Sequence, residues 1–390
     1  MTRNNYTCGI DIGTHTIRVV VMGFNKEANA FEVLGVGASS TEGVREGYIT
    51  NTDTVANSLK KAITQAEKII GYKIKRAYVS LGGINLSSSV STGSAVISRA
   101  DQEITQLDIT KALADSEENI DLLNKKIVHI IPLGYKLDGK DLHGRPEGMK
   151  GIKLEVKTLF VTCLKQNIED LVTTCALAHV EIEDIIAAPL ANSLLLLSTK
   201  QKTAGCALLD IGFETVSLAV FENNLLLSLQ VFPLGSMDIT KDIALGFKIS
   251  LEEAESIKLG SLIGGDYPKK KVDEIIEARL GDILELVGNH LKRLRRNELL
   301  PAGIIITGGA SYIQKIEELT RSVLKLPARV GPSDSALNHK FKIRDNSWYI
   351  AYGLATSTTD GTSNNISSSL GNNIKEVKGF FKSFFSQLLP

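Results

Sequence analysis

The chain has 390 residues and is 43% apolar, which is enough for two or three domains with sizeable cores. Basic and acidic residues number 44 each, so the net charge of zero provides no basic field for nucleic acid. The four cysteines lack metal-ligand spacing, which predicts reduced thiols in a cytosolic protein. A run of about 18 apolar residues, which a membrane span needs, is missing, so we expect any membrane contact to be peripheral.

Near the N-terminus lies the stretch CGIDIGTHTIRVV (8–20), and it returns as CALLDIGFETVSLAV (206–220). In each copy, the apolar runs predict two buried strands joined by a glycine turn. Free turn amides, with the hydroxyls of Thr14 and Thr16, can donate hydrogen bonds to a phosphate. Asp11 and Asp210 suit a Mg²⁺ ion reached through water. One such turn is ordinary hairpin chemistry, but two copies predict a phosphate clamp.

After the first hairpin, apolar residues at helical spacing predict a helix over 52–70, and 74–83 reads as a strand. This strand, helix, strand order is typical of a sheet covered by helices. The residue pattern then changes, and 84–164 reads as Ser-rich strands with one helix near 104–120. We expect this segment to be a separate inserted module.

A helix near 166–179, a strand and a further helix lead into the second hairpin, and 246–300 reads as polar, amphipathic helices. The stretch GIIITGGASYIQKIEEL predicts a buried strand, a Gly308-Gly309 turn and a helix that begins at Ser311. Such a turn can accept a flat ring or a phosphate against bare backbone. Two glycines also join strands to helices for packing reasons alone.

The C-terminal residues divide into two parts. Residues 356–373 are rich in Ser, Thr, Asn and Gly, which predicts a flexible linker. Residues 374–390 have an amphipathic helical pattern, which predicts a reversible membrane anchor. A tail helix docked on its own domain or on a partner is the alternative. The predicted lipid-facing residues are Val377, Phe380, Phe381, Phe384, Phe385, Leu388 and Leu389, with Lys378 and Lys382 at the apolar edge.

The duplicated D-I-G-x-x-T hairpins and the strand-TGGA-helix resemble the actin, hexokinase and Hsp70 ATPase superfamily. Further stretches resemble one of its families, FtsA of bacterial cell division, and with them the resemblance covers essentially the whole chain. These stretches are EGYITNTDTVANSLKKAITQAEKIIGYKIKRAYVSLGG, HIIPLGYKLDG, PEGMKGIKLEVKTLFVT, AESIKLG and the terminal amphipathic helix.

The resemblance implies an α/β, actin-like two-lobed fold of duplicated ribonuclease-H-like domains, with an inserted subdomain 1C and no subdomain 1B. The implied order is 1A at 1–83, 1C at 84–164, 1A at 165–200, 2A at 201–245, 2B at 246–300, 2A at 301–338, 1A at 339–355, the linker at 356–373 and the anchor helix at 374–390.

The same resemblance implies ATP with Mg²⁺ bound between the lobes and at most weak ATPase activity, with no catalytic residue assigned. It implies filaments of the chain itself on the cytoplasmic face of an anionic membrane at the division site. FtsZ would bind through its C-terminal tail at 2B, beside other divisome proteins. The implied nucleotide residues are Gly13, Thr14, His15, Thr16, Asp210, Gly212, Thr215, Glu255, Lys258, Gly308, Gly309 and Ala310, and the implied metal residues are Asp11 and Asp210.

The second loop departs from the family pattern D-I-G-G-G-T, because Phe213 and Glu214 stand where further glycines belong. A carboxylate weakens phosphate binding unless Glu214 turns away or meets the metal. The pilus-assembly relative PilM, which shares the fold, is the competing assignment, but it lacks the terminal anchor as a regular feature. A metabolic kinase is a third alternative, disfavoured because the 1C-like insertion replaces the usual substrate-binding elaborations.

Overall fold

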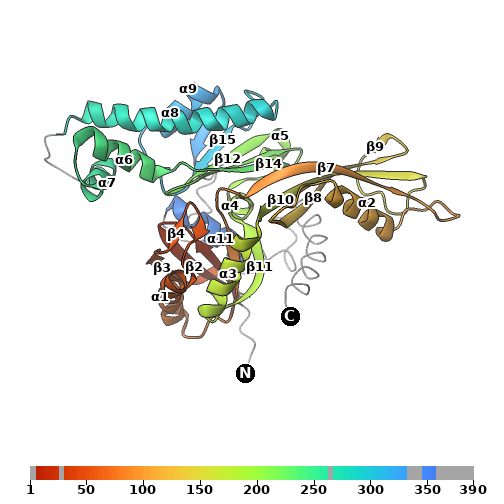
Figure 1. The fold of residues 1–390 in the computed structure, drawn as a ribbon, viewed down its shortest axis with the longest axis horizontal. Helices are drawn as coiled ribbons and strands as arrows, with labels where there is room; N and C mark the ends of the chain where they lie inside the picture. Colours follow the sequence, from red (N-terminus) through yellow and green to blue (C-terminus); the bar gives the residue numbers. More distant parts are fainter. Residues whose placement is uncertain (1–5, 26–29, 262–266, 332–344, 357–390) are drawn as a thin grey trace.

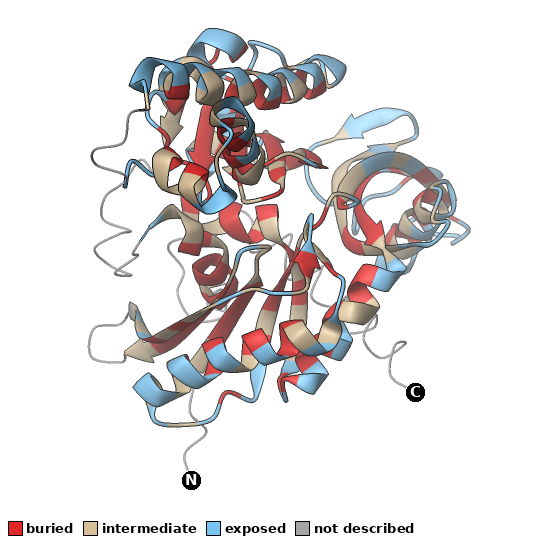
Figure 2. Ribbon diagram, turned by 60° about the vertical axis from the view of Figure 1, so that its left-hand side comes forward, coloured by how far each residue is buried: buried red, intermediate tan, exposed pale blue. Residues whose placement is uncertain are grey.

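The computed structural model describes residues 6–25, 30–261, 267–331 and 345–356. Two lobes lie one above the other, and a narrower arm of strands with one helix projects from between them (Figure 1). Buried residues gather in the central strands of both lobes, whereas the outer faces of the covering helices are exposed (Figure 2). The expected two-lobed α/β architecture is therefore confirmed.

The first lobe is built on a five-stranded sheet in the order β11-β6-β1-β2-β3. β1 and β2 form an antiparallel hairpin, while β6 runs parallel to both β1 and β11. A small separate hairpin, β4–β5, follows β3. The strand bounds are β1 (Tyr6–Ile12), β2 (Thr16–Asn25), β3 (Ala30–Ser40), β4 (Val44–Arg45), β5 (Tyr48–Ile49), β6 (Arg76–Leu81) and β11 (Glu181–Ala187).

The helix expected over 52–70 is confirmed as α1 (Thr52–Ile70). It begins where Asn51 accepts a hydrogen bond from the Thr54 amide and ends at the left-handed Gly71. Its apolar stripe is buried against the sheet beside β3. The approach is so close that a Cβ on Gly37 would lie 1.9 Å from the carbonyl oxygen of Ala62, so a glycine is required there.

The other face of this sheet is covered by α4 and by a helix from the C-terminal part of the described chain, α11. A Cβ on Gly353 of α11 would lie 2.0 Å from the carbonyl oxygen of Ala191 in α4. One on Gly9 of β1 would meet the carbonyl oxygen of Ala351. The remaining helices of this lobe are α3 (Lys165–Leu177), α4 (Ala188–Leu196), the one-turn η1 (Asn346–Trp348) and α11 (Tyr349–Thr356), which takes in the first residue of the expected linker.

The second lobe repeats the hairpin arrangement of the first. β12 and β13 are antiparallel, and β15 runs parallel to β12. Three helices, α6, α8 and α9, pack with this half of the sheet around a second apolar core. The bounds are α5 (Thr199–Ala204), β12 (Cys206–Ile211), β13 (Val216–Glu222), β14 (Leu225–Phe232), α6 (Ser236–Phe247), α7 (Leu251–Lys258), α8 (Lys269–Arg293), β15 (Ile304–Thr307), α9 (Ile316–Leu324) and β16 (Ala328–Val330).

The arm between the lobes has its own small apolar core between its helix and its sheet. Its sheet is nevertheless continuous with that of the second lobe, because Ser87 of β7 pairs with Gln230 of β14 and completes a nine-stranded sheet. The imidazole Nε2 of His129 accepts the Ala187 amide at 3.0 Å, which also fixes the arm to the first lobe. The elements are β7 (Ser87–Val96), α2 (Gln106–Glu118), β8 (Lys125–Leu137), β9 (Lys140–Leu142) and β10 (Lys153–Leu164).

One helix boundary predicted from the sequence is wrong. The helix expected to begin at Ser311 begins at Ile316 instead. Ser311 is held in a turn, because its hydroxyl donates to the carbonyl of Gly308 at 2.8 Å. Lys315 then takes a left-handed conformation with φ 61°, which separates the turn from α9.

The predicted anchor helix at 374–390 and nearly all of the predicted linker lie outside the described residues. Both stay predictions from the sequence. Within the ranges that the structure describes, none of the helices has both the length and the apolar character needed to cross a membrane.

Candidate functional site

Two aspartates end equivalent strands of the two lobes. Asp11 lies at the end of β1, where it is the cross-strand partner of Arg18. Asp210 lies at the end of β12, beside Ser217 on one side and Thr307 of β15 on the other. The two-fold repeat seen in the sequence is thus a structural repeat, with a carboxylate at the same place in each lobe.

Asp11 is buried, with 6% of its surface exposed. The hydroxyl of Ser80, on the neighbouring β6, donates to Asp11 Oδ1 at 2.8 Å. Burial raises the pKa of Asp11, while the charge of Arg18 and the Ser80 hydrogen bond lower it. The carboxylate is therefore held by one hydroxyl donor and faces one nearby cation.

The pKa of Asp210 is raised as well. Burial and then the negative charge of Asp11 raise its pKa to about 7, against the opposing effects of Asn192 and Arg18. The Asn192 amide donates to Asp210 Oδ2 at 2.9 Å. Because Asp11 contributes to this shift, the two lobes bring their carboxylates close enough to repel each other.

The turns after the two aspartates meet across the lobes. The rings of His15 and Phe213 lie with their centroids 4.7 Å apart. In the second turn the amide of Gly212 donates to the carbonyl of Thr215 at 2.9 Å. The expectation of free outward-pointing amides is therefore wrong for Gly212, because this amide closes its own hairpin.

Glu214, the acidic one of the two residues that depart from the family pattern, turns away from the aspartates. Its two carboxylate oxygens accept from the Arg45 guanidinium and from the Glu46 amide, each at 2.7 Å. Both donors belong to the β4–β5 hairpin of the first lobe. The acidic charge that would weaken phosphate binding is thus paired elsewhere.

The predicted glycine turn follows β15 and folds against the second hairpin. Gly308 has φ 92°, and a Cβ there would lie 2.3 Å from Asp210 Oδ1. Gly309 is exposed, and its Cβ would meet nothing within 4 Å. Ala310 is buried, with its amide donating to the carbonyl of Ile211. The absence of a side chain at Gly308 thus leaves room for the Asp210 carboxylate, while Gly309 offers the bare backbone that a flat ring can approach.

Glu255 and Lys258 lie on α7 and form one network with α6. The Lys258 ammonium is buried and contacts Glu255 Oε2 at 2.7 Å and Thr240 Oγ1 at 2.8 Å. Burial lowers the pKa of Lys258, and the carboxylate of Glu255 opposes this shift. Burial and then the charge of Glu255 raise the pKa of the half-exposed Tyr312 to about 12, which places the ring near this network.

The facing carboxylates fit a hydrated divalent cation. In the part of the chain that the structure describes, no group of three or more His, Cys, Asp or Glu side chains could hold a metal by itself. Mg²⁺ keeps most of its waters and takes one or two carboxylates together with phosphate oxygens, so this donor set suits it. Asn192 Oδ1, beside Asp210, is buried without a hydrogen-bond partner among the described residues, which suits a bound water.

Sequence reasoning missed four residues of this site: Arg18, Arg45, Ser80 and Asn192. Two of them carried a signal, because Arg18 interrupts the apolar run TIRVVV and Asn192 interrupts LANSLLLLS. A polar side chain inside a buried element needs a partner. Asn192 donates to Asp210, whereas Arg18 donates to the Thr16 carbonyl and acts on both aspartates through its charge. Ser80 and Arg45 gave no such signal, because their partners are distant in the sequence.

The two lobes with facing aspartate hairpins define an actin-like protein, and comparison of structures supports this class. The PilM-PilN type IV pilus biogenesis complex has a chain that matches with a TM-score of 0.67 at 16% identity, over 90% of this chain and 97% of that one. MreB5 of Spiroplasma citri bound to ADP matches with a TM-score of 0.55 at 12% identity, over 96% and 99%. These similarities show a shared fold.

Sequence comparison decides the family. The cell division protein FtsA model matches residues 207–357, and the model of the SHS2 domain inserted in FtsA matches residues 83–162. The cell division protein FtsA of Bacillus subtilis strain 168 is 31% identical over 91% of this chain and 83% of its own length. The chain therefore belongs to the FtsA family of actin-like cell-division proteins.

The contact between Gly308 and Asp210 can be tested with neighbouring glycines. We expect Gly308→Ala to lower the free energy of unfolding by about 1–3 kcal/mol, because its Cβ meets Asp210 and its φ disfavours a side chain. Gly309→Ala is the matched control and should change it by less than about 0.5 kcal/mol, since its Cβ meets open space. Urea unfolding followed by circular dichroism measures both. Equal destabilisation by the two variants would contradict the close contact.

Proposed function

We propose that this protein binds ATP with Mg²⁺ between its lobes and uses the nucleotide to control its assembly in cell division. The observation that carries the proposal is the pair of carboxylates, the buried Asp11 and the partly buried Asp210, that the two lobes bring together. Among the described residues, Arg18 is the cation that opposes this repulsion at both carboxylates. A divalent cation between these side chains and phosphate oxygens would relieve it.

Different residues of the chain bind the phosphates, the nucleoside and the base of the nucleotide. Hydroxyls of Thr14 and Thr16 donate to phosphate oxygens in the first turn, although Thr16 Oγ1 also contacts His15 Nδ1. Lys258 and Glu255 hold α7 beside the nucleoside, and the exposed backbone at Gly309 takes the base. The metal, when bound, supplies positive charge to the phosphates. No residue is assigned a catalytic role, and any ATPase activity is weak.

Replacement of Asp210 tests the role of the metal. We expect Asp210→Asn to weaken binding of a fluorescent ATP analogue at least about tenfold in Mg²⁺, because the variant loses the charge that holds the ion. In EDTA the variant should bind at least as tightly as the unaltered chain, because it lacks a charge that repels the phosphates. Asp141→Asn is the control, since the Asp141 side chain is 77% exposed in the arm. Unchanged affinity of Asp210→Asn in Mg²⁺ would contradict the metal role, and failure of the unaltered chain to bind would overturn the nucleotide proposal.

The second part of the proposal concerns the membrane. Residues 374–390 place four phenylalanines on one face of a predicted helix, with two lysines at its edge. Burial of each large apolar side chain contributes roughly 1.5–3 kcal/mol. Insertion of several of these side chains together therefore exceeds the cost of folding a short helix. We propose that this helix anchors filaments of the protein to the cytoplasmic face of the membrane, at the division site.

Electron microscopy on an anionic lipid monolayer tests anchor and assembly together. With ATP and Mg²⁺ we expect filaments on the lipid, and none for the chain cut after Asn373 or for the pair Phe380→Glu and Phe384→Glu. The matched control is Phe380→Leu with Phe384→Leu, which keeps the apolar face and should retain lipid binding. Lipid binding without filaments would favour a PilM-like scaffold. Filaments on lipid without residues 374–390 would contradict the anchor.

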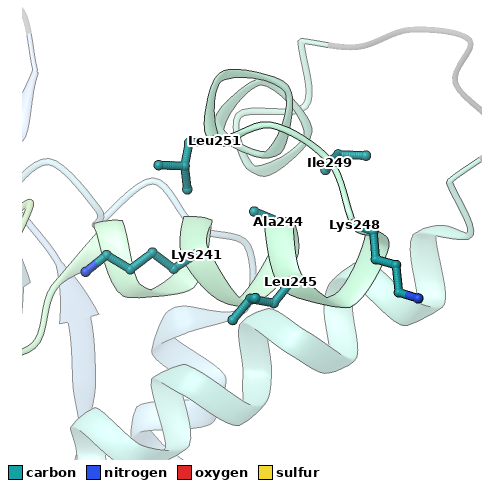
Figure 3. A pocket seen from close by; sticks show the side chains of 6 residues that line it. All are labelled: Lys241, Ala244, Leu245, Lys248, Ile249 and Leu251. Carbon is teal, nitrogen blue, oxygen red and sulfur yellow. The ribbon is translucent and has the colours of Figure 1, made fainter.

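The partner surface is proposed to lie on the segment expected to be subdomain 2B (246–300) and the adjoining end of α6. A groove there has an apolar centre with lysines at both ends (Figure 3), and it is lined by Lys241, Ala244, Leu245, Lys248, Ile249 and Leu251. Leu245 is 76% exposed and Leu251 is 46% exposed. Such a surface fits a short segment that carries both apolar and acidic side chains, and we propose that the FtsZ C-terminal tail occupies it.

Substitution of two exposed leucines, one in the groove and one outside it, tests whether the groove binds the peptide. Leu245→Glu should weaken binding of an FtsZ C-terminal peptide at least about tenfold, because it places a charge in the apolar centre. Leu123→Glu is the control, since Leu123 is 77% exposed but lies in the arm. Fluorescence anisotropy with the labelled peptide measures both. Equal affinities for the two variants would place the peptide elsewhere.

A further inference from the structure

The side chain of Glu214 joins the second phosphate-binding turn to the first lobe. Its exposed fraction is 8%, and both of its carboxylate oxygens are used. Oε1 accepts from Arg45 Nη1 at 2.7 Å, and Oε2 accepts from the Glu46 amide at 2.7 Å. The donors and the acceptor are separated by 168 or 169 residues in the chain, so the contact crosses from lobe to lobe.

Phe213 makes a second crossing contact beside the first. Its ring meets the imidazole of His15 with the ring planes inclined by 50°. Glycines at 213 and 214 would make neither contact, because both depend on side chains. Where the family pattern has flexible glycines, this chain therefore has two side chains that hold the lobes together.

The first-lobe end of this contact is firmly placed. Arg45 and Glu46 belong to the β4–β5 hairpin and its turn. The turn continues into Gly47, where a Cβ would lie 2.5 Å from the amide nitrogen of Gly83 at the end of β6. The hydroxyl of Tyr48 accepts the Asn85 amide at 2.7 Å. The hairpin thus moves with the first sheet and not as a free loop.

The second-lobe end is fixed by the start of α6. The carbonyl of Phe213 accepts the Met237 amide at 2.8 Å, and that of Gly212 accepts the Ser236 amide at 2.9 Å. Gly235 packs so closely that a Cβ there would lie 2.7 Å from the Glu214 amide nitrogen. Helix α6 also carries Thr240, which contacts both Glu255 and Lys258. A displacement of Glu214 would therefore also move α6, which contributes Thr240 to the proposed nucleoside site.

We propose that Glu214, with Arg45 and Glu46, is an interlobe clasp that holds the cleft closed and positions the second phosphate turn. The clasp acts on lobe closure by itself, and its effect on ligand retention rests on the nucleotide binding proposed above. Because closure surrounds a bound nucleotide, a clasp that favours the closed state slows nucleotide release. Glu214 and Arg45 are positioning residues, since their paired charges do not face the ligand.

Lobe closure can be measured directly with spin labels. Lys68→Cys on α1 and Glu285→Cys on α8 place labels on exposed helical positions of the two lobes. The four native cysteines are buried, so they do not compete for the label. Pulsed electron paramagnetic resonance then gives the distribution of interlobe distances, without nucleotide and with Mg-ADP.

We expect a narrow distribution for the unaltered chain without nucleotide, and a broader, longer one for Glu214→Ala and for Arg45→Ala. Arg45→Ala keeps the proposal testable if Glu214→Ala fails to fold, because the Arg45 side chain is 74% exposed. The double variant should be no worse than Glu214→Ala, since the two residues act through one contact. Lys73→Ala is the control, because it breaks an exposed ion pair, to Glu67, that lies within one lobe.

The release rate of a fluorescent Mg-ADP analogue is the second readout. It should rise roughly tenfold in Glu214→Ala, as expected from the loss of a charge-assisted contact. Unchanged distances and release rates in both single variants would overturn the clasp. If the unaltered chain binds no nucleotide, the proposed function fails while the distance distributions still decide the clasp. Broadened distances with unchanged release would overturn its role in retention.

Discussion

The repulsion between two carboxylates, one buried and one partly buried, is the constraint on which the site depends. Asp11 and Asp210 end strands of different lobes, and the charge of Asp11 helps raise the pKa of Asp210 to about 7. Burial without a counter-charge is unfavourable, and each carboxylate is given one neutral donor, Ser80 or Asn192. Within the described parts of the chain, Arg18 is the one cation that lowers the pKa of both. The fold therefore leaves negative charge between its lobes that nearby cations do not fully balance.

The same geometry explains why an acidic residue is tolerated in the second turn. Glu214 does not add to the negative charge at the aspartates, because its carboxylate is occupied by Arg45 and the Glu46 amide. A departure from the glycine-rich family pattern thus becomes a contact between lobes. The loss of backbone freedom at 213 and 214 is matched by contacts that glycine cannot make.

The inserted arm relates the lobes in another way. Its chain leaves and re-enters the first lobe, yet β7 joins the sheet of the second lobe beside β14. His129 ties the arm back to the first lobe through the Ala187 amide. The arm is thus connected to both lobes. Structural similarity to PilM and MreB5 establishes the fold, whereas the sequence relatives establish the FtsA family.

The sequence by itself determined the repeat, the two aspartates and the helix over 52–70, because periodicity and short motifs are local properties. It also identified the glycine turn at 308 and 309, but not the start of the next helix, since a Ser311 hydrogen bond decided that boundary. The tertiary structure alone decided the partners of Asp210 and Glu214. Those partners come from distant parts of the chain, and a side chain's hydrogen bonds depend on which strands the fold makes neighbours.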